Sequence, residues 1–169
     1  MAYLLENFVI EEDPKIIKVL TERGYGTLDK EQRLILSPYE ALYLLENKRI
    51  LVESKNKKIE FKELMKEFIK KEKDIDIKYI VYSDLREKGY ILKSGYRFGT
   101  PLRVYEKGIR PGEGKSSFLI EVISEREKIT ILEIYRLLRV AQIAKKNLII
   151  AIVRENRKVD YIKLNSIKL

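Results

Sequence analysis

The sequence predicts an α/β (α+β) protein with a small N-terminal α/β domain, residues 1–74, and a C-terminal domain, residues 75–169. Two observations lead to this prediction. Short apolar segments alternate with amphipathic segments along the chain, which is the pattern of strands and helices that share a core. The run KEFIKKEKDIDIK is dense in charge, and such a run usually marks a solvated helix end between two parts of a chain.

The N-terminal half is expected to contain both strands and helices. The strands are expected at 3–10, 33–36 and 50–54, and the helices at 13–24, 37–50 and 57–73. Asp13 caps the first helix, with Pro14 in its first turn and Gly24 at its end. Ser37 and Glu40 stand three residues apart as a capping box, so the second helix has the clearest local signal.

The C-terminal half is expected to form a mixed sheet with a helix on each face. Its helices are expected at 79–90 and 129–147, and its strands at 90–95, 101–108, 117–124, 147–153 and 159–164. Thr130 and Glu133 form a second capping box at the start of the long helix. The continuous apolar run NLIIAIV is typical of a strand that is buried on both sides.

Composition narrows the classes of function. Lys and Arg outnumber Asp and Glu by 35 to 26, and the resulting net charge of +9 favours a phosphate-bearing partner such as a nucleic acid. The chain has no Cys and no His, so it forms no disulfide and lacks the usual zinc ligands, and we expect no metal and no cofactor. Because no apolar run could span a bilayer and the N-terminus lacks a basic signal segment, we expect a cytoplasmic protein without membrane contact.

Three kinds of nuclease chemistry can be compared with the residues present. A two-metal site needs clustered carboxylates, but the candidates Asp84, Glu121 and Glu125 fall in a helix, a strand and a turn. An acid–base pair that depends on histidine is impossible within this chain. Metal-free RNA cleavage through the ribose 2′-hydroxyl needs a base, an acid and a cation beside the phosphorane, and these are roles that Tyr, His and Lys side chains fill.

Three segments resemble the archaeal tRNA-splicing endonuclease family. The segment YSDLREKGYILKSGYRFGTPLRVYEKG is similar to the family's signature of a helix, a glycine-rich run and a strand that ends in tyrosine. LLRVAQIAKKNLIIAIV resembles its later helix-to-strand segment, and RLILSPYEALYLLENKRILVE resembles its N-terminal domain. The resemblance implies a restriction-nuclease-like C-terminal domain and a tetrameric assembly. It also implies cleavage of precursor tRNA at a bulge–helix–bulge, which leaves 2′,3′-cyclic phosphate and 5′-hydroxyl ends.

The resemblance also implies which residues occupy the family's functional positions. The catalytic tyrosine falls on Tyr105 and the catalytic lysine on Lys146, whereas the place of the catalytic histidine is taken by Lys115, followed by Ser116. The family's arginine that clamps a bulge base across a subunit boundary falls on Arg139, seven residues before Lys146. Taken alone, Tyr105 is one of 11 tyrosines, and Lys146 fits the end of a helix, where a cation complements the dipole.

The missing histidine shapes the expected function. An exposed lysine has a pKa of about 10.4 and stays charged near pH 7, where an imidazole takes and gives protons. We therefore expect a structural, RNA-positioning subunit of a heterotetramer (a dimer of heterodimers) in which a histidine-bearing catalytic paralogue cuts precursor tRNA. Two alternatives stay open: a self-sufficient metal-free RNA endonuclease that uses Tyr105, Lys115 and Lys146, and a non-enzymatic RNA-binding module.

Two assembly features follow from the same resemblance. The strand 159–164 corresponds to the edge through which the family pairs its subunits. The turn RENR before it corresponds to a loop that is acidic in many relatives and docks into a partner, but only Glu155 in this turn is acidic. This difference argues against a docking role for the turn.

Overall fold

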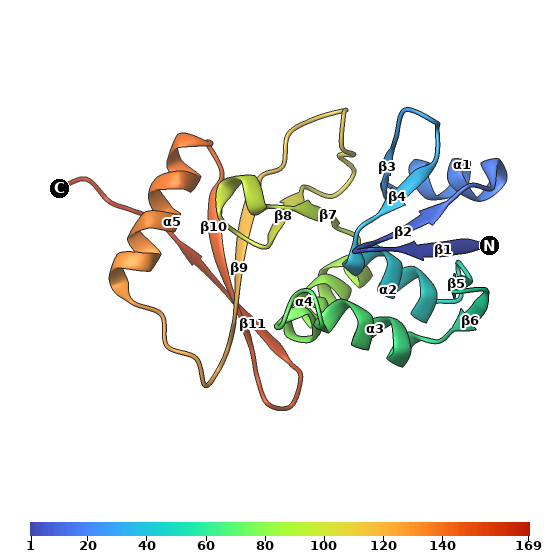
Figure 1. Cartoon of the computed structure of the whole chain (residues 1–169). Helices are drawn as coiled ribbons and strands as arrows, with labels where there is room; N and C mark the ends of the chain where they lie inside the picture. The colour runs from blue at the N-terminus through green and yellow to red at the C-terminus, as the bar shows by residue number, and fades with distance from the viewer. The chain divides into compact units, whose positions relative to one another are not determined.

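The computed structural model describes residues 1–169, and the chain divides into two compact units, Met1–Tyr79 and Ile80–Leu169. Each unit combines one sheet with helices (Figure 1), which confirms the expected α+β class. Acidic and basic side chains balance within residues 1–79, so the net charge of +9 lies in residues 80–169.

The first unit is built on a mixed sheet of six strands in the order β3-β4-β2-β1-β5-β6. The strands are β1 (Ala2–Leu5), β2 (Phe8–Glu11), β3 (Thr27–Leu28), β4 (Leu34–Leu36), β5 (Val52–Ser54) and β6 (Lys57–Ile59). β1 and β5 are parallel, and the other neighbours are antiparallel. The helices are α1 (Pro14–Glu22), α2 (Pro38–Glu46) and α3 (Phe61–Ile69).

The predicted caps of the first two helices are confirmed. The side chain of Asp13 accepts a hydrogen bond from the N–H of Lys15 at 2.9 Å, which fixes the start of α1. Ser37 and Glu40 form the reciprocal capping box of α2. The side chains of α2 that follow, among them Leu42 with no exposed surface, lie in the core of the unit. Full burial of one such leucine contributes roughly 1.5–3 kcal/mol to folding.

The second unit is built on a sheet of five strands in the order β11-β10-β9-β8-β7. Helix α4 (Ile75–Glu87) begins in the first unit and continues into the second. The other elements of the second unit are β7 (Ile91–Ser94), the 3-10 turn η1 (Tyr96–Phe98), β8 (Leu102–Tyr105), β9 (Phe118–Ser124), α5 (Ile131–Ile143), β10 (Asn147–Val153) and β11 (Val159–Leu164). β9 and β10 are parallel and the other neighbours are antiparallel, so the predicted mixed sheet is confirmed.

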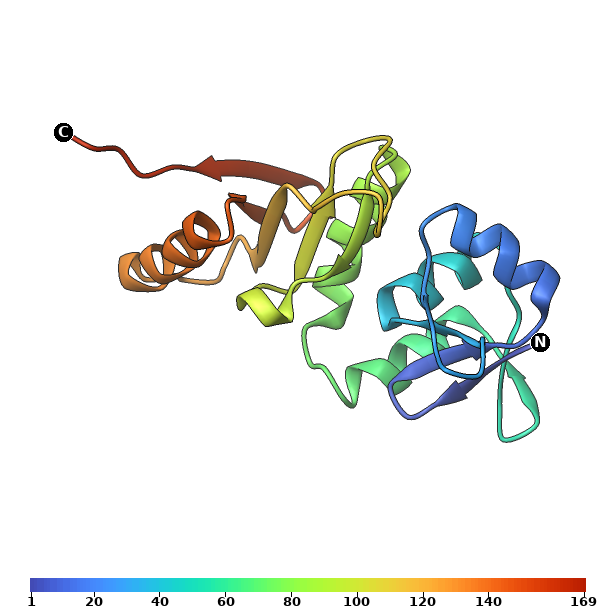
Figure 2. The ribbon, with the colours of Figure 1, turned by 90° about the horizontal axis from the view of Figure 1, so that it is seen from above.

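Helices α4 and α5 cover opposite faces of this sheet (Figure 2). Leu119 of β9 pairs with Leu148 of β10, and both lie in one cluster with Ala141 of α5. Tyr161 of β11 instead donates a hydrogen bond to the carboxylate of Asp84 on α4. Side chains alternate between the two faces along a strand, and the register of β10 and β11 places Tyr161 on the face opposite Leu148.

Two predicted elements are wrong because tight turns interrupt them. The segment 3–10 is the hairpin β1–β2 instead of one strand, with Glu6 at φ 53° in its turn. The first residues of the predicted helix 57–73 form strand β6, because Lys55 and Asn56 both have positive φ and close a two-residue hairpin turn. Neither turn contains glycine, so no strong turn signal is present at either place.

Two further differences come from short or buried elements. β3 has two residues, which is too short for a periodic pattern. The helix predicted from residue 79 begins at Ile75, within the charged run. Ile75 and Tyr79 are four residues apart and both buried, so burial against the core extends the helix backward. None of the helices combines the length and the apolar character needed to cross a membrane.

Candidate active site

Tyr105 lies at the end of β8 and is only 4% exposed. Arg103 precedes it by two residues and therefore lies on the same face of the strand. The Nη1 of Arg103 donates a hydrogen bond to the hydroxyl oxygen of Tyr105 at 3.0 Å, and its Nε donates to the carbonyl oxygen of Ser94 at 2.8 Å. The guanidinium carbon also lies 5.6 Å from the centre of the tyrosine ring. Arg103 thus holds the Tyr105 hydroxyl and contributes a cation beside it.

Lys146 is placed by the turn that ends α5. The N–H of Lys146 donates to the carbonyl oxygen of Ala141 at 2.8 Å, and the N–H of Lys145 donates to that of Gln142 at 3.1 Å. Lys145 has φ 56°, so the three features together form the Schellman motif that often ends helices. The motif turns the half-buried side chain of Lys146 toward the loop before β9. There its Nζ donates a hydrogen bond to the carbonyl oxygen of Ser116 at 2.6 Å.

The loop from β8 to β9 carries Lys115 at the expected place of the histidine. Lys115 is exposed, whereas Ser116 is 5% exposed and its hydroxyl has no hydrogen-bond partner within the chain. Ser117 fixes the end of the loop, since its N–H donates to Val104 at 2.8 Å and its carbonyl oxygen accepts from the N–H of Asn147 at 2.9 Å. The loop therefore enters β9 in a defined position beside the end of α5.

The charges of Arg97, Arg103 and Lys115 lie close enough to Lys146 to act on its amine, and we call these four residues the cation cluster. Burial lowers the pKa of Lys146 below its ordinary value, and the positive charges of Arg103, Lys115 and Arg97 lower it further. The structure thus brings Lys115 and Lys146 into one electrostatic neighbourhood, with Tyr105 attached to it through Arg103. Such a cluster can bind phosphate and stabilise a phosphorane.

The turn before β8 completes the cluster. Phe98 lies under two cations, since its ring centre is 5.4 Å from the Nζ of Lys146 and 4.7 Å from the guanidinium carbon of Arg97. Gly95 allows this turn to close tightly. A Cβ at Gly95 would lie 2.6 Å from the Oγ1 of Thr100 and 2.8 Å from the backbone of Leu102. A side chain at this position would therefore displace the turn that holds Arg97 and Phe98.

Arg139 lies apart from the cation cluster. It is exposed on α5, seven residues before Lys146 and four residues before the last residue of the helix. The structure shows no contact between Arg139 and the residues of the cluster within the chain. Its sequence-based role therefore depends on what binds to this surface of α5.

The acidic candidates for a two-metal site do not come together. Asp84 accepts hydrogen bonds from Tyr161 and, at 2.8 Å, from the Nζ of Lys88, on the α4 face of the sheet. Glu121 precedes Val122 by one residue on β9 and lies on the other face, where Oε1 accepts from the N–H of Val122. Nowhere in the structure do three side chains of the metal-binding types gather into a group that could hold a metal ion.

Sequence reasoning missed Arg97 and Arg103. Arg103 had a usable signal, because its spacing of two from Tyr105 places both side chains on one face of the predicted strand. Arg97 had none, because the fold of a glycine-containing turn decides where its side chain lies.

Two contacts within the chain account for the position of Glu155 in the turn RENR. Glu155 forms an ion pair with Arg126, and its N–H donates to the carboxylate of Glu125 at 2.9 Å.

Both halves of the chain match family models. The model described as tRNA intron endonuclease, N-terminal domain, matches residues 1–65, and the model described as tRNA intron endonuclease, catalytic C-terminal domain, matches residues 75–161. Curated relatives match along almost the whole chain. A protein named tRNA-splicing endonuclease from Pyrococcus abyssi (strain GE5 / Orsay) is 41% identical over 167 residues, which cover 98% of this chain and 95% of the relative.

Two more relatives carry the same name. The tRNA-splicing endonuclease of Pyrococcus horikoshii is 42% identical over 167 residues, which cover 98% of this chain and 95% of that protein. The tRNA-splicing endonuclease of Methanococcus vannielii is 37% identical over 169 residues, with 99% of this chain and 94% of that protein covered. These matches extend across both structural units.

Proposed function

The chain belongs to the tRNA intron endonuclease family, and from that premise we propose that it is the non-catalytic subunit of a heteromeric tRNA-splicing endonuclease. In this proposal the chain helps to position precursor tRNA at a bulge–helix–bulge. A histidine-bearing paralogue in the same heterotetramer performs the cleavage. The products carry 2′,3′-cyclic phosphate and 5′-hydroxyl ends.

The reaction explains what a catalytic subunit must provide. The ribose 2′-oxygen attacks the adjacent phosphorus while a base takes its proton. The bond from phosphorus to the 5′-oxygen then breaks, and an acid returns a proton to that leaving oxygen. The base and acid work best when their pKa values lie near the working pH, and a cation must stabilise the charge on the phosphorane.

The single observation that carries the proposal is that the groups gathered at this site are cations and one tyrosine, in a chain that has no histidine. Lys115, Lys146, Arg97 and Arg103 can hold a phosphate, but an exposed lysine does not exchange protons readily near pH 7. Tyr105 is buried and its hydroxyl accepts a hydrogen bond from Arg103. The site therefore supports binding better than proton transfer.

Apolar side chains on α5 and β11 support the proposed assembly. β11 is an edge strand of the second sheet, and its Ile162 is 45% exposed. On α5, Ile131 is 81% exposed and Ile143 is 78% exposed, with Leu132 and Tyr135 also open to solvent. Exposed apolar side chains of this size usually mark a surface that another chain covers. We propose that the paralogue covers this surface in the heterotetramer.

One observation favours a second candidate, the self-sufficient metal-free endonuclease. The lowered pKa of Lys146 brings this lysine closer to the range in which it can accept a proton, with Lys115 nearby as a second amine. Reconstitution distinguishes the candidates. Precursor tRNA with a bulge–helix–bulge is incubated with the chain, with the paralogue, and with both together. The proposal predicts cleavage when the paralogue and this chain are combined. If the chain adds nothing to the paralogue's rate or assembly, the subunit role is wrong.

A further inference from the structure

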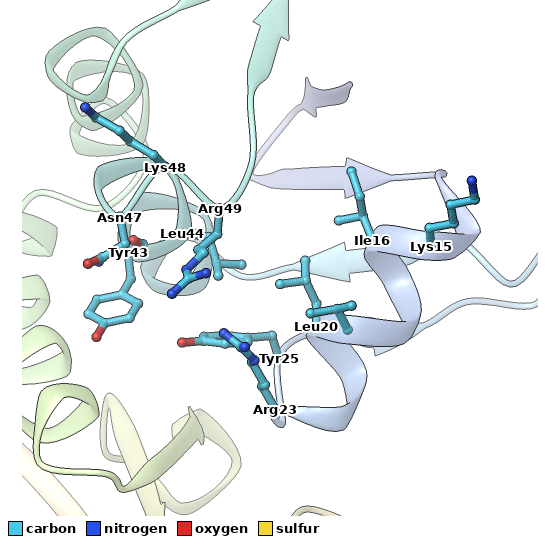
Figure 3. A pocket seen from close by; sticks show the side chains of 11 residues that line it. Lys15, Ile16, Leu20, Arg23, Tyr25, Tyr43, Leu44, Asn47, Lys48 and Arg49 are labelled. Carbon is cyan, nitrogen blue, oxygen red and sulfur yellow. The ribbon is translucent and has the colours of Figure 1, made fainter.

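A pocket of about 470 Å³ lies in the first unit, between one side of α1 and the C-terminal end of α2 (Figure 3). Apolar residues of both helices form part of its lining. Its other side chains are those of Lys15, Arg23, Lys48, Arg49, Tyr25 and Tyr43, together with one asparagine. The site belongs to a different unit from the cation cluster, and the proposed subunit role does not use it.

Rigid helix ends place two of these side chains. The N–H of Tyr25 donates to the carbonyl oxygen of Leu20 at 3.0 Å, and the N–H of Arg49 donates to that of Leu44 at 2.8 Å. Both contacts are the long hydrogen bond of a Schellman motif, so Tyr25 and Arg49 occupy equivalent positions after α1 and α2. Lys48 adopts φ 55° at the position before Arg49, where glycine is common. Backbone geometry therefore presets the lining of the pocket.

The residues that line this pocket are more positively charged than the first unit as a whole. Four of the lining residues are cationic and none is acidic, although acidic and basic side chains balance within residues 1–79. Cations near a helix C-terminus also complement its dipole, but each helix end carries only about half a negative charge. Two helix ends therefore account for about one of the four positive charges, so the lining residues and the helix ends together carry a net positive charge.

Two aromatic rings lie beside these cations, of which that of Tyr25 is buried and that of Tyr43 is half-buried. The ring centres of Tyr25 and Tyr43 are 6.5 Å apart with an angle of 26° between the rings. Figure 3 shows the guanidinium groups of Arg23 and Arg49 directed toward Tyr25, while the side chain of Lys48 points outward. Guanidinium groups bind phosphate with paired hydrogen bonds, and tyrosine rings stack on nucleic-acid bases. The combination fits a ligand that has both a phosphate and a flat ring.

We propose that this pocket binds an unpaired nucleotide of an RNA strand, with its base against Tyr43 and its phosphate at Arg23 and Arg49. A free nucleotide has the same chemistry, but its charge ends within the pocket. Lys15 and Lys48 lie at the two ends of the lining, and their side chains suit the phosphates that precede and follow a nucleotide within a strand. The RNA strand therefore uses all four cations.

The test is an NMR titration of the full chain with an unstructured ten-nucleotide uridylate and, separately, with uridine monophosphate. The expected result is that the oligonucleotide shifts the backbone amides of residues 23–25 and 47–49 and binds at least tenfold more tightly than the mononucleotide. Shifts confined to residues 80–169 would show that the oligonucleotide does not bind at this pocket. Equal affinities for the two ligands at residues 23–25 and 47–49 would overturn the assignment to an RNA strand.

Variants connect the shifts to the proposed contacts. Replacing Arg23→Gln and Arg49→Gln together should weaken binding at this pocket by about tenfold or more. The dependence of log affinity on log salt concentration should also become shallower by about 0.7, for the one phosphate that both arginines contact on a single strand. The matched control is Lys55→Gln with Lys57→Gln, which removes two charges from the β5–β6 hairpin of the same unit. An equal loss from the control would show that only the total charge matters, and the site would be wrong.

A second pair of variants tests the aromatic contact without changing charge. Tyr43→Phe keeps the ring and should bind as the unchanged chain does, whereas Tyr43→Leu keeps an apolar side chain and should lose about tenfold in affinity, within the range of one base stack. Both proteins are first compared by their NMR spectra without ligand, so that a folding defect is recognised. Equal affinities of folded Phe and Leu variants would exclude stacking on Tyr43.

Discussion

The Nζ of Lys146 donates a hydrogen bond to the backbone carbonyl oxygen of Ser116 at 2.6 Å, which ties the end of α5 to the loop that enters β9. This contact sets the position of Lys146 beside Lys115 and Arg103. The lysine is held by the backbone, and its placement does not depend on the side chain at position 115.

The charge of Arg103 should contribute to the lowered pKa of Lys146. Burial is the largest cause of the lowered pKa, and Arg103 is the first of the three cations that add to it. Arg103→Gln should therefore raise the pKa of Lys146 while leaving it below its ordinary value. The measurement is an NMR titration of the Lys146 side chain. Arg136→Gln, which removes an exposed charge from α5, is the control and should leave the pKa unchanged. An unaltered pKa in Arg103→Gln would contradict the proximity of the two cations.

Tyr161 should make the second unit sensitive to alkaline pH. Burial, the hydrogen bond to Asp84 and the charge of that carboxylate all raise the pKa of Tyr161. Above about pH 10 the unfolded chain ionises this tyrosine while the folded chain keeps it neutral, so the free energy of unfolding falls as pH rises. Tyr161→Phe should lose about 1.5–3 kcal/mol at pH 7, because a hydrogen bond to a charged group is lost. Its stability should then fall less steeply above pH 10.

Urea unfolding at pH 7 and at pH values above 10 measures both effects of Tyr161→Phe. Tyr135→Phe is the matched control, because Tyr135 is exposed on α5 and its hydroxyl should contribute little. If Tyr161→Phe and the unchanged chain lose stability equally at high pH, ionisation of Tyr161 does not govern the alkaline response.

Local patterns predicted much of the fold, while the site depended on contacts that no local pattern contains. The capping boxes at Ser37 and Thr130 marked two helix starts correctly, because a cap uses residues three apart in sequence. The turn at Lys55 was missed, because a non-glycine residue with positive φ has no strong sequence signal. Arg97 was missed for another reason. Its approach to Lys146 depends on the packing of η1 against the end of α5, far away in sequence.

Substitutions at the family's catalytic positions test the proposed division of labour. Tyr105→Phe and Lys146→Ala in this subunit should leave the cleavage rate of the assembled enzyme nearly unchanged. The corresponding changes in the paralogue should abolish cleavage, because only its site contains the histidine. Single-turnover cleavage by reconstituted tetramers provides the measurement. A large loss caused by Tyr105→Phe in this subunit, with assembly intact, would assign catalysis to this chain as well.

Arg139 should act in trans on the bulge of the RNA. Stacking of a guanidinium plane on a flipped base is worth roughly 1–3 kcal/mol, so Arg139→Ala should slow cleavage by about tenfold to a hundredfold. Arg139→Lys should rescue poorly, because lysine keeps the charge and loses the planar face. Assembly is measured in parallel, because Arg139 lies four residues from both Tyr135 and Ile143, on the surface of α5 that the paralogue is proposed to cover. Wild-type rates in the Arg139→Lys tetramer would leave charge as the only contribution, and wild-type rates in Arg139→Ala would make Arg139 an ordinary surface residue.

The most direct measurement of the central claim is single-turnover cleavage of a bulge–helix–bulge RNA by the purified chain alone, in the presence of EDTA. The account predicts no product with a 2′,3′-cyclic phosphate end at any enzyme concentration, because the site provides cations and no imidazole. Lys115→Ala should behave in the same way. Metal-independent cleavage by the unchanged chain that disappears in Lys115→Ala would contradict the account and identify Lys115 as a catalytic residue.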